Sequence, residues 1–126
     1  MNKAKEDLGQ SFRHAFAGLR QAITTQRNLR IHLAAAVVVT LLGLWVGLKP
    51  WEFAILILLY GLVIGMELMN TVVEVVVDML SPSFSPLAKR AKDLSAGAVL
   101  VTAIVAVLVG LLLFGPHLID MVRGPM

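Results

Sequence analysis

Residues 53–80, FAILILLYGLVIGMELMNTVVEVVVDML, decide how this chain of 126 residues folds. The first 14 of them, residues 53–66, carry no strongly polar side chain. A helix that crosses a bilayer needs roughly 20 apolar residues, so this helix must carry Glu67 into the membrane to finish crossing. A carboxylate near the centre of a membrane helix costs about 2.5–3.5 kcal/mol, and such residues usually have a function. We therefore expect Glu67 to belong to a functional site.

Polar side chains continue along one face of the same helix. Glu67, Asn70, Glu74 and Asp78 follow at i, i+3, i+7 and i+11, and at roughly 100° per residue they lie within about 80° of one another. A polar seam that only holds helices together is the alternative, but such seams usually consist of Ser, Thr or Asn. Several carboxyl groups favour a proton-transfer or cation site instead.

The composition is that of a membrane protein with one domain, residues 1–126. Of all residues, 58% are apolar, which is more than a soluble domain of this size can bury. The chain contains no cysteine, which excludes a disulfide framework and a thiolate zinc site.

Four helical segments are expected. Residues 6–28 repeat apolar side chains on one helical face, which predicts an amphipathic helix on the membrane surface; a helix docked on a soluble core is the alternative. Membrane helices are expected over residues 31–48, 53–80 and 93–114, and Gly115 and Pro116 are expected to end the last one before a short tail, residues 115–126. The fold class is an all-α integral membrane protein with a surface helix and three membrane spans.

Basic residues predict the orientation. Six of the 11 Lys and Arg residues precede the first span, and three lie between the second and third spans. The positive-inside rule then places the N-terminus and residues 81–92 in the cytoplasm. We expect a multi-pass protein of the inner (plasma) membrane with its site on the cytoplasmic side.

The polar residues at that side suit metal-assisted phosphoryl transfer. Carboxylates hold Mg²⁺ together with substrate phosphates, a lysine such as Lys92 neutralises phosphate, and a deeper carboxylate can accept a hydroxyl proton. Asp93 could also simply cap the third span, and Lys89 and Arg90 are interpreted as topology determinants. His14 and His32 have no partner at metal-ligand spacing, so a packing or headgroup role is expected for both.

Three motifs then identify a family resemblance. Residues 67–74, ELMNTVVE, and 91–100, AKDLSAGAVL, strongly resemble the prokaryotic diacylglycerol kinase and undecaprenol kinase family, and residues 27–32, RNLRIH, look like its undecaprenol-kinase branch. The similarity covers residues 10–115. It implies three-span homotrimers with a surface helix, whose active sites lie at subunit contacts and use MgATP to phosphorylate a lipid alcohol.

The resemblance also implies a role for each site residue. Glu67 would be the general base at the substrate, Asn70 would position groups beside it, and Glu74 would bind the metal. The remaining contacts that it implies are the nucleotide contacts Lys92, Asp93, Ser83, Phe84 and Ser85, a purine-site contact at His14, and a lipid-facing position at Ala96. Gln26 stands where the family typically has a second metal-binding glutamate, and an amide oxygen brings no charge to Mg²⁺.

The sequence thus predicts a membrane lipid kinase with ATP, Mg²⁺, a lipid alcohol and the bilayer as its partners, and no nucleic acid. The RNLRIH segment favours undecaprenol over diacylglycerol slightly. The alternatives are a non-catalytic protein whose acidic stripe binds cations in a homo-oligomer, and a family member that lost activity because of Gln26. The absence of polar side chains over residues 53–59 argues against a path for cations through the membrane.

Overall fold

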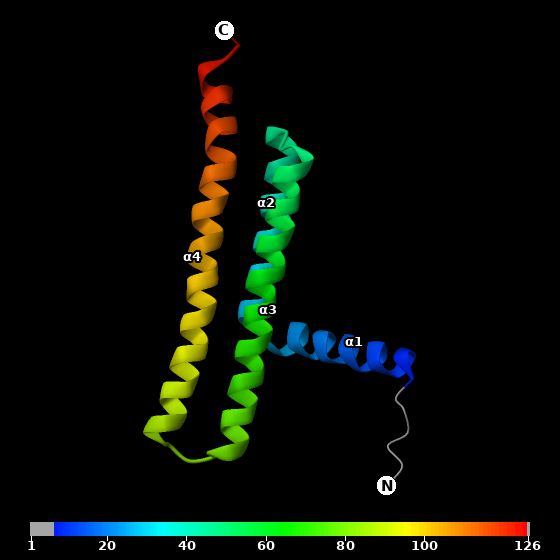
Figure 1. The fold of residues 1–126 in the computed structure, drawn as a ribbon, viewed down its shortest axis with the longest axis vertical. Coiled ribbons are helices and arrows are strands. Elements are labelled where there is room, and N and C mark those ends of the chain that lie inside the picture. The colour runs from blue at the N-terminus through cyan, green and yellow to red at the C-terminus, as the bar shows by residue number, and fades with distance from the viewer. Residues whose placement is uncertain (1–6, 126) are drawn as a thin grey trace.

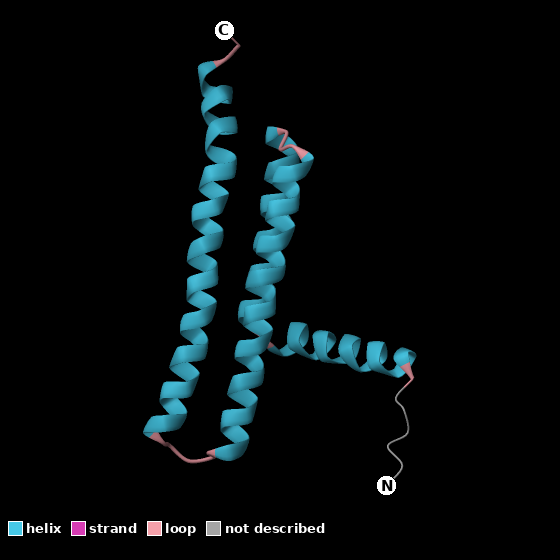
Figure 2. Cartoon of the chain, in the orientation of Figure 1, coloured by secondary structure: helices cyan, strands magenta, loops and turns pink. Residues whose placement is uncertain are grey.

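The computed structural model describes residues 7–125, and every regular element in that range is an α-helix. The helices are α1 (Leu8–Thr25), α2 (Arg27–Val46), α3 (Pro50–Leu80) and α4 (Pro86–Arg123). Within the described residues, α2, α3 and α4 are long and apolar enough to cross a membrane. The all-α architecture with three candidate spans is therefore confirmed (Figure 2). Residue 6 of the expected surface helix, and Lys3 and Lys5 of the basic N-terminal segment, lie outside the described residues.

The helix ends follow from local chemistry. Gly47 ends α2 in the left-handed conformation, with φ of 78°, which costs glycine little because it has no Cβ. Lys49 precedes α3, and its backbone N–H donates to Glu52 Oε2 at 2.7 Å. Ser85 caps α4, since its hydroxyl oxygen accepts from the backbone N–H of Ala88 at 3.4 Å. Proline occupies the first position of both α3 and α4, where its missing N–H costs no helical hydrogen bond.

The prediction that Gly115 and Pro116 end the last helix was wrong. The helix does not stop at Phe114 but passes through Gly115 and Pro116 to Arg123. A proline inside a helix removes one hydrogen bond and crowds the preceding turn. Here a tertiary contact accompanies the extra turns, because His117 Nε2 lies 3.0 Å from both carboxylate oxygens of Glu52 on α3.

The three long helices run side by side, and α1 leaves them at a steep angle, nearer the 81–85 loop than the opposite end (Figure 1). The buried apolar cluster consists of Leu48, Leu56, Leu59 and Leu113. Most other large apolar side chains are exposed, and the chain exposes 9,741 Å² where a compact soluble monomer of this size would expose roughly 6,600 Å². An apolar exterior of this kind suits helices that face lipid or other protein chains.

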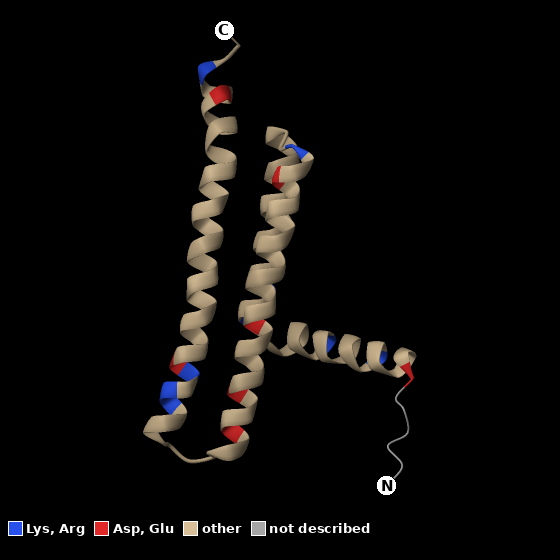
Figure 3. Ribbon diagram, in the orientation of Figure 1, with Lys and Arg blue, Asp and Glu red and all other residues tan. Residues whose placement is uncertain are grey.

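Charged side chains are segregated along the bundle. Figure 3 shows most of the acidic residues of α3 and the basic residues of α4 at the end near the 81–85 loop, and long uncharged stretches above them. The charged residues expected to form the site, Glu67, Glu74, Lys92 and Asp93, therefore lie toward this end of α3 and α4.

Candidate active site

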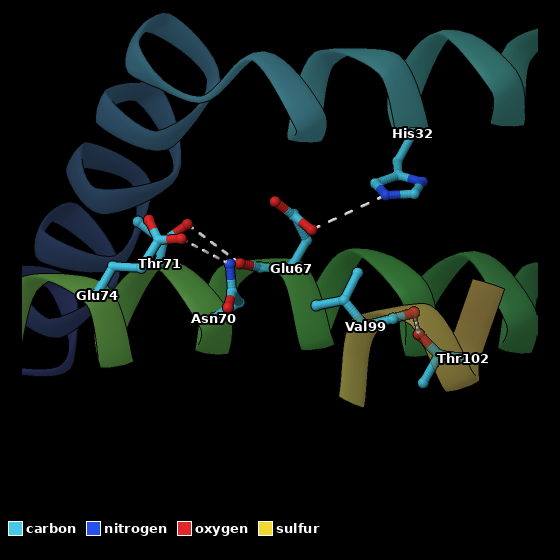
Figure 4. A network of polar contacts seen from close by, with 7 residues as sticks. All are labelled: His32, Glu67, Asn70, Thr71, Glu74, Val99 and Thr102. Carbon is cyan, nitrogen blue, oxygen red and sulfur yellow. Dashed lines mark hydrogen bonds and ion pairs between the residues drawn. The ribbon is translucent and has the colours of Figure 1, made fainter. Parts of the chain in front are cut away.

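Glu67 is the most deeply buried acidic residue on the stripe. It lies on α3 with 2% of its surface exposed, and its Oε2 is 3.9 Å from Nε2 of His32 on α2. Figure 4 shows the two side chains pointing toward each other across the gap between α2 and α3. One turn further along, the Thr71 hydroxyl donates to the Glu67 backbone carbonyl at 3.1 Å. A buried carboxylate of this kind suits proton transfer more than solvation.

Asn70 and Glu74 form the next part of the stripe. Asn70 is 7% exposed, and its Nδ2 donates to Glu74 Oε1 at 3.1 Å (Figure 4). Its Oδ1 is buried and has no hydrogen-bond partner among the described residues. Because a buried polar atom without a partner costs free energy, this oxygen can accept a hydrogen bond from a group outside the described residues.

A cavity of 330 Å³ lies where α3 meets the loop to α4. It gathers all five expected nucleotide contacts on the loop and α4: Ser83, Phe84, Ser85, Lys92 and Asp93. Lys92 forms an ion pair with Asp78 of α3, and Lys89 forms one with Asp93. A phosphate entering the cavity would therefore meet two lysines, and the volume is at the lower end of the range for ligand pockets, about 300–1,000 Å³.

Gln26, His14 and Ala96 are less closely tied to the stripe. Gln26 is half-buried in an extended conformation between α1 and α2, whereas His14 and Ala96 are exposed on α1 and α4. Among residues 7–125, no hydrogen bond or ion pair links Gln26 or His14 to α3. Over the same range, no three His, Asp or Glu side chains come close enough to hold a metal ion without other ligands.

Two contacts of this region were absent from the sequence interpretation. His32 was expected to pack or to meet headgroups, yet it faces Glu67. Asp78 was placed on the acidic stripe but not in the nucleotide loop, where it pairs with Lys92. A signal for the second contact was present, since a short loop makes α3 and α4 antiparallel and brings their flanking residues together. No sequence signal indicated the first, because it depends on how α2 lies against α3.

A second, apolar cavity of 580 Å³ lies among α2, α3 and α4. His32 lines it, and so does Tyr60, whose hydroxyl is 2.9 Å from Thr40 Oγ1. Nearly all its other lining side chains are aliphatic or aromatic. The cavity thus reaches His32, which faces Glu67.

Comparisons with known proteins identify the family of this chain. The family model described as prokaryotic diacylglycerol kinase matches residues 13–114. The chain is 44% identical over 108 residues to the undecaprenol kinase of Bacillus subtilis, covering 86% of this chain and 88% of that protein. It is 46% identical over 112 residues to the diacylglycerol kinase of Synechocystis, covering 88% of this chain and 64% of that protein. It is 30% identical over 104 residues to the diacylglycerol kinase of Escherichia coli, covering 82% of this chain and 85% of that protein. The chain belongs to the prokaryotic diacylglycerol kinase family and is a multi-pass membrane lipid kinase.

Proposed function

We propose that this chain transfers the γ-phosphate of ATP to a lipid alcohol, with undecaprenol as the first candidate and diacylglycerol as the second. The observation that carries the proposal is the buried Glu67 carboxylate, which shares one helix face with Asn70 and Glu74. The cavity that holds Lys92 lies at the same end of the bundle. The relative from Bacillus subtilis, named an undecaprenol kinase, matches over 88% of its length and supports the choice of lipid.

In the proposed reaction, Glu67 accepts the proton of the lipid hydroxyl. The hydroxyl oxygen forms a bond to the γ-phosphorus while the bond from that phosphorus to the bridging β–γ oxygen breaks, and ADP leaves with the electron pair. The amide nitrogen of Asn70 donates a hydrogen bond to Glu74. Its unpartnered Oδ1 accepts a hydrogen bond from the substrate. Lys92 exchanges its contact with Asp78 for the phosphates, which it neutralises as a point charge.

The residues present also fit Mg²⁺. Glu74 and Gln26 offer a carboxylate and an amide oxygen, which are the hard ligands that this ion prefers together with phosphate oxygens. No three acidic or histidine groups of residues 7–125 form a metal cluster, so nucleotide phosphates would have to complete the coordination. When bound, Mg²⁺ neutralises charge that develops on the transferred phosphoryl group.

The remaining site residues have proposed roles that come from the family resemblance. Ser83, Phe84, Ser85 and Asp93 surround the nucleotide in the loop cavity. His14 contacts the purine and Ala96 faces the lipid, both from exposed positions that a ligand or a neighbouring subunit can reach. The apolar cavity beside His32 accepts part of the lipid chain, because its lining matches hydrocarbon.

We further propose a homotrimer in the plasma membrane with the 81–85 loop in the cytoplasm. Basic residues concentrate on that side, as the positive-inside rule requires. The large exposed apolar area leaves helix faces for both lipid and subunit contacts, and subunits meeting there would bring α1 residues of one chain to the stripe of another.

The test is phosphate transfer from γ-labelled ATP in mixed micelles, with undecaprenol and diacylglycerol offered separately. Glu67→Gln keeps the shape of the side chain but removes the basic carboxylate, so the rate should fall by roughly 10²–10⁴. Circular dichroism and gel filtration should not change. Absence of product on both lipids, from a folded oligomer, would refute the kinase proposal and favour an inactive or cation-binding member of the family.

A further inference from the structure

The contact between Glu67 and His32 joins two helices at the centre of the site. Glu67 has 3% of its side chain exposed and His32 has 25%. Their nearest nitrogen and oxygen atoms are 3.9 Å apart, which is longer than a hydrogen bond and within reach of one after a small side-chain rotation. No other Lys, Arg or His nitrogen of residues 7–125 lies within 4.0 Å of the Glu67 carboxylate.

No other charged side chain of the described residues pairs with Glu67 or His32. On α3, Glu74 is held by Asn70, and on α2 the Arg30 guanidinium donates to the backbone carbonyls of Ile23 and Thr24 at 3.0 and 3.1 Å. The titratable residues of α1, which are Arg13, His14 and Arg20, form no ion pair with Glu67. Residues 94–116 of α4 contain no titratable side chain. His32 is therefore the one basic group that the described chain offers to Glu67.

A general base must lose its proton before the next turnover, and burial limits the direct access of water to Glu67. The imidazole of His32 is more exposed and can accept a proton at Nε2 when it is neutral. We propose that His32 is a positioning residue that acts through Glu67: its Nε2 receives from the Glu67 carboxyl group the proton that leaves the lipid hydroxyl. This inference rests on the proposed kinase function.

The proton balance of this step is simple. As the new O–P bond forms, the hydroxyl proton moves to Glu67, and the neutral carboxyl group then passes it to His32 Nε2. The carboxylate is restored, the imidazolium carries the positive charge, and this proton is then released to water at the N-terminal end of α2, which begins at Arg27. No oxidant, reductant or further reactant is needed.

The variant His32→Gln tests the proposal. Its amide nitrogen can occupy the region of Nε2 and donate a hydrogen bond, but it cannot accept a proton. We expect kcat to fall by at least about tenfold, while KM for ATP stays within about twofold, because ATP loses no binding contact. If His32→Gln does not assemble, His32→Asn replaces it, since it also lacks a proton acceptor.

A matched control is available at the opposite end of the bundle. His117 forms the other His–Glu contact between helices, with Glu52, and lies outside the proposed site. His117→Gln should therefore keep the wild-type kcat per folded protein. A comparable fall of kcat in both variants would show that loss of any interhelical His–Glu contact disturbs the bundle, and would overturn a specific role for His32.

The pH dependence separates proton acceptance from structural support. Protonated His32 cannot accept the proton, so wild type loses this advantage as pH falls, whereas His32→Gln never has it. The ratio of kcat between wild type and His32→Gln should therefore be largest at high pH and shrink toward low pH. A ratio that is constant with pH, with kcat still reduced, would refute proton acceptance and leave a purely structural role.

A double mutant tests whether His32 acts through Glu67. Glu67→Asp draws the carboxylate away from His32, so adding His32→Gln in that background should cost less than about threefold. A full additional loss would mean that His32 acts independently of Glu67. Failure of the two proposals can be told apart: inactive wild type refutes the kinase function, whereas active wild type with unaffected His32→Gln refutes this inference alone.

Discussion

Gln26→Glu tests the metal site with little structural disturbance. Gln26 is half-buried between α1 and α2, and no hydrogen bond of its side chain to another described residue would be lost. Among the described residues, Gln26 makes backbone hydrogen bonds alone, with Ala22 and Arg30. Its position precedes the first turn of α2, where a negative charge is favourable by about 0.3–1 kcal/mol because of the helix dipole. The substitution should therefore be tolerated.

The size of the effect follows from replacing a neutral ligand by a charged one. Neutral hydrogen-bonding contacts contribute about 1 kcal/mol and contacts to charged groups about 1.5–3 kcal/mol, and Gln26 is only half-buried, so solvent reduces the gain. A gain of about 1 kcal/mol corresponds to roughly a fivefold decrease in the Mg²⁺ concentration needed for half-maximal rate. We expect this decrease at saturating ATP and lipid, with kcat unchanged or raised.

The assay varies free Mg²⁺ and follows labelled lipid phosphate. Gln21→Glu is the matched control, because it makes the same chemical change on the exposed part of α1 and alters the net charge equally. It should leave the Mg²⁺ requirement at the wild-type value. An unchanged or higher requirement in Gln26→Glu removes Gln26 from the metal site, and an equal decrease in both variants would show a general charge effect at the membrane surface.

Two further predictions concern the ends of α4. Lys92→Gln should raise KM for ATP roughly tenfold, because one charged contact to phosphate is lost. Arg90 lies outside the loop cavity, so Arg90→Gln should change this KM less than about twofold. Equal effects of the two substitutions would mean that only the total charge matters. Glu52→Ala should lower the melting temperature in detergent, because the backbone N–H of Lys49 loses its acceptor and His117 loses its partner. The kcat per folded protein should be retained. An unchanged melting temperature would show that these contacts do not stabilise this end of α3 and α4.

The acidic stripe was predictable because all of its residues lie on one helix. Helical periodicity alone places Glu67, Asn70 and Glu74 on a common face, and the structure shows a hydrogen bond within that face. The five residues that the resemblance implies as nucleotide contacts line one cavity, because they lie in or close to a short turn between two long helices. In both cases local geometry decides the arrangement.

The continuation of α4 was not predictable in the same way. Pro116 favours a helix end locally, whereas the continued helix carries a contact between residues 65 positions apart, Glu52 and His117. The partner of Glu67 was missed for a similar reason, since His32 lies on another helix. Periodicity within one helix shows which residues share a face of that helix. The register between two helices depends on packing that a single sequence does not reveal.

The two His–Glu contacts of α3 differ in a way that bears on function. At one end, Glu52 accepts from the Lys49 backbone at 2.7 Å and lies 3.0 Å from His117, so its hydrogen-bonding capacity is used within the fold. At the other, Glu67 is also buried but stays 3.9 Å from His32. A contact at hydrogen-bond distance stabilises the fold, whereas the longer contact leaves the buried Glu67 carboxylate free to accept a proton. This difference is the physical reason to expect Glu52→Ala to act on stability and His32→Gln to act on turnover.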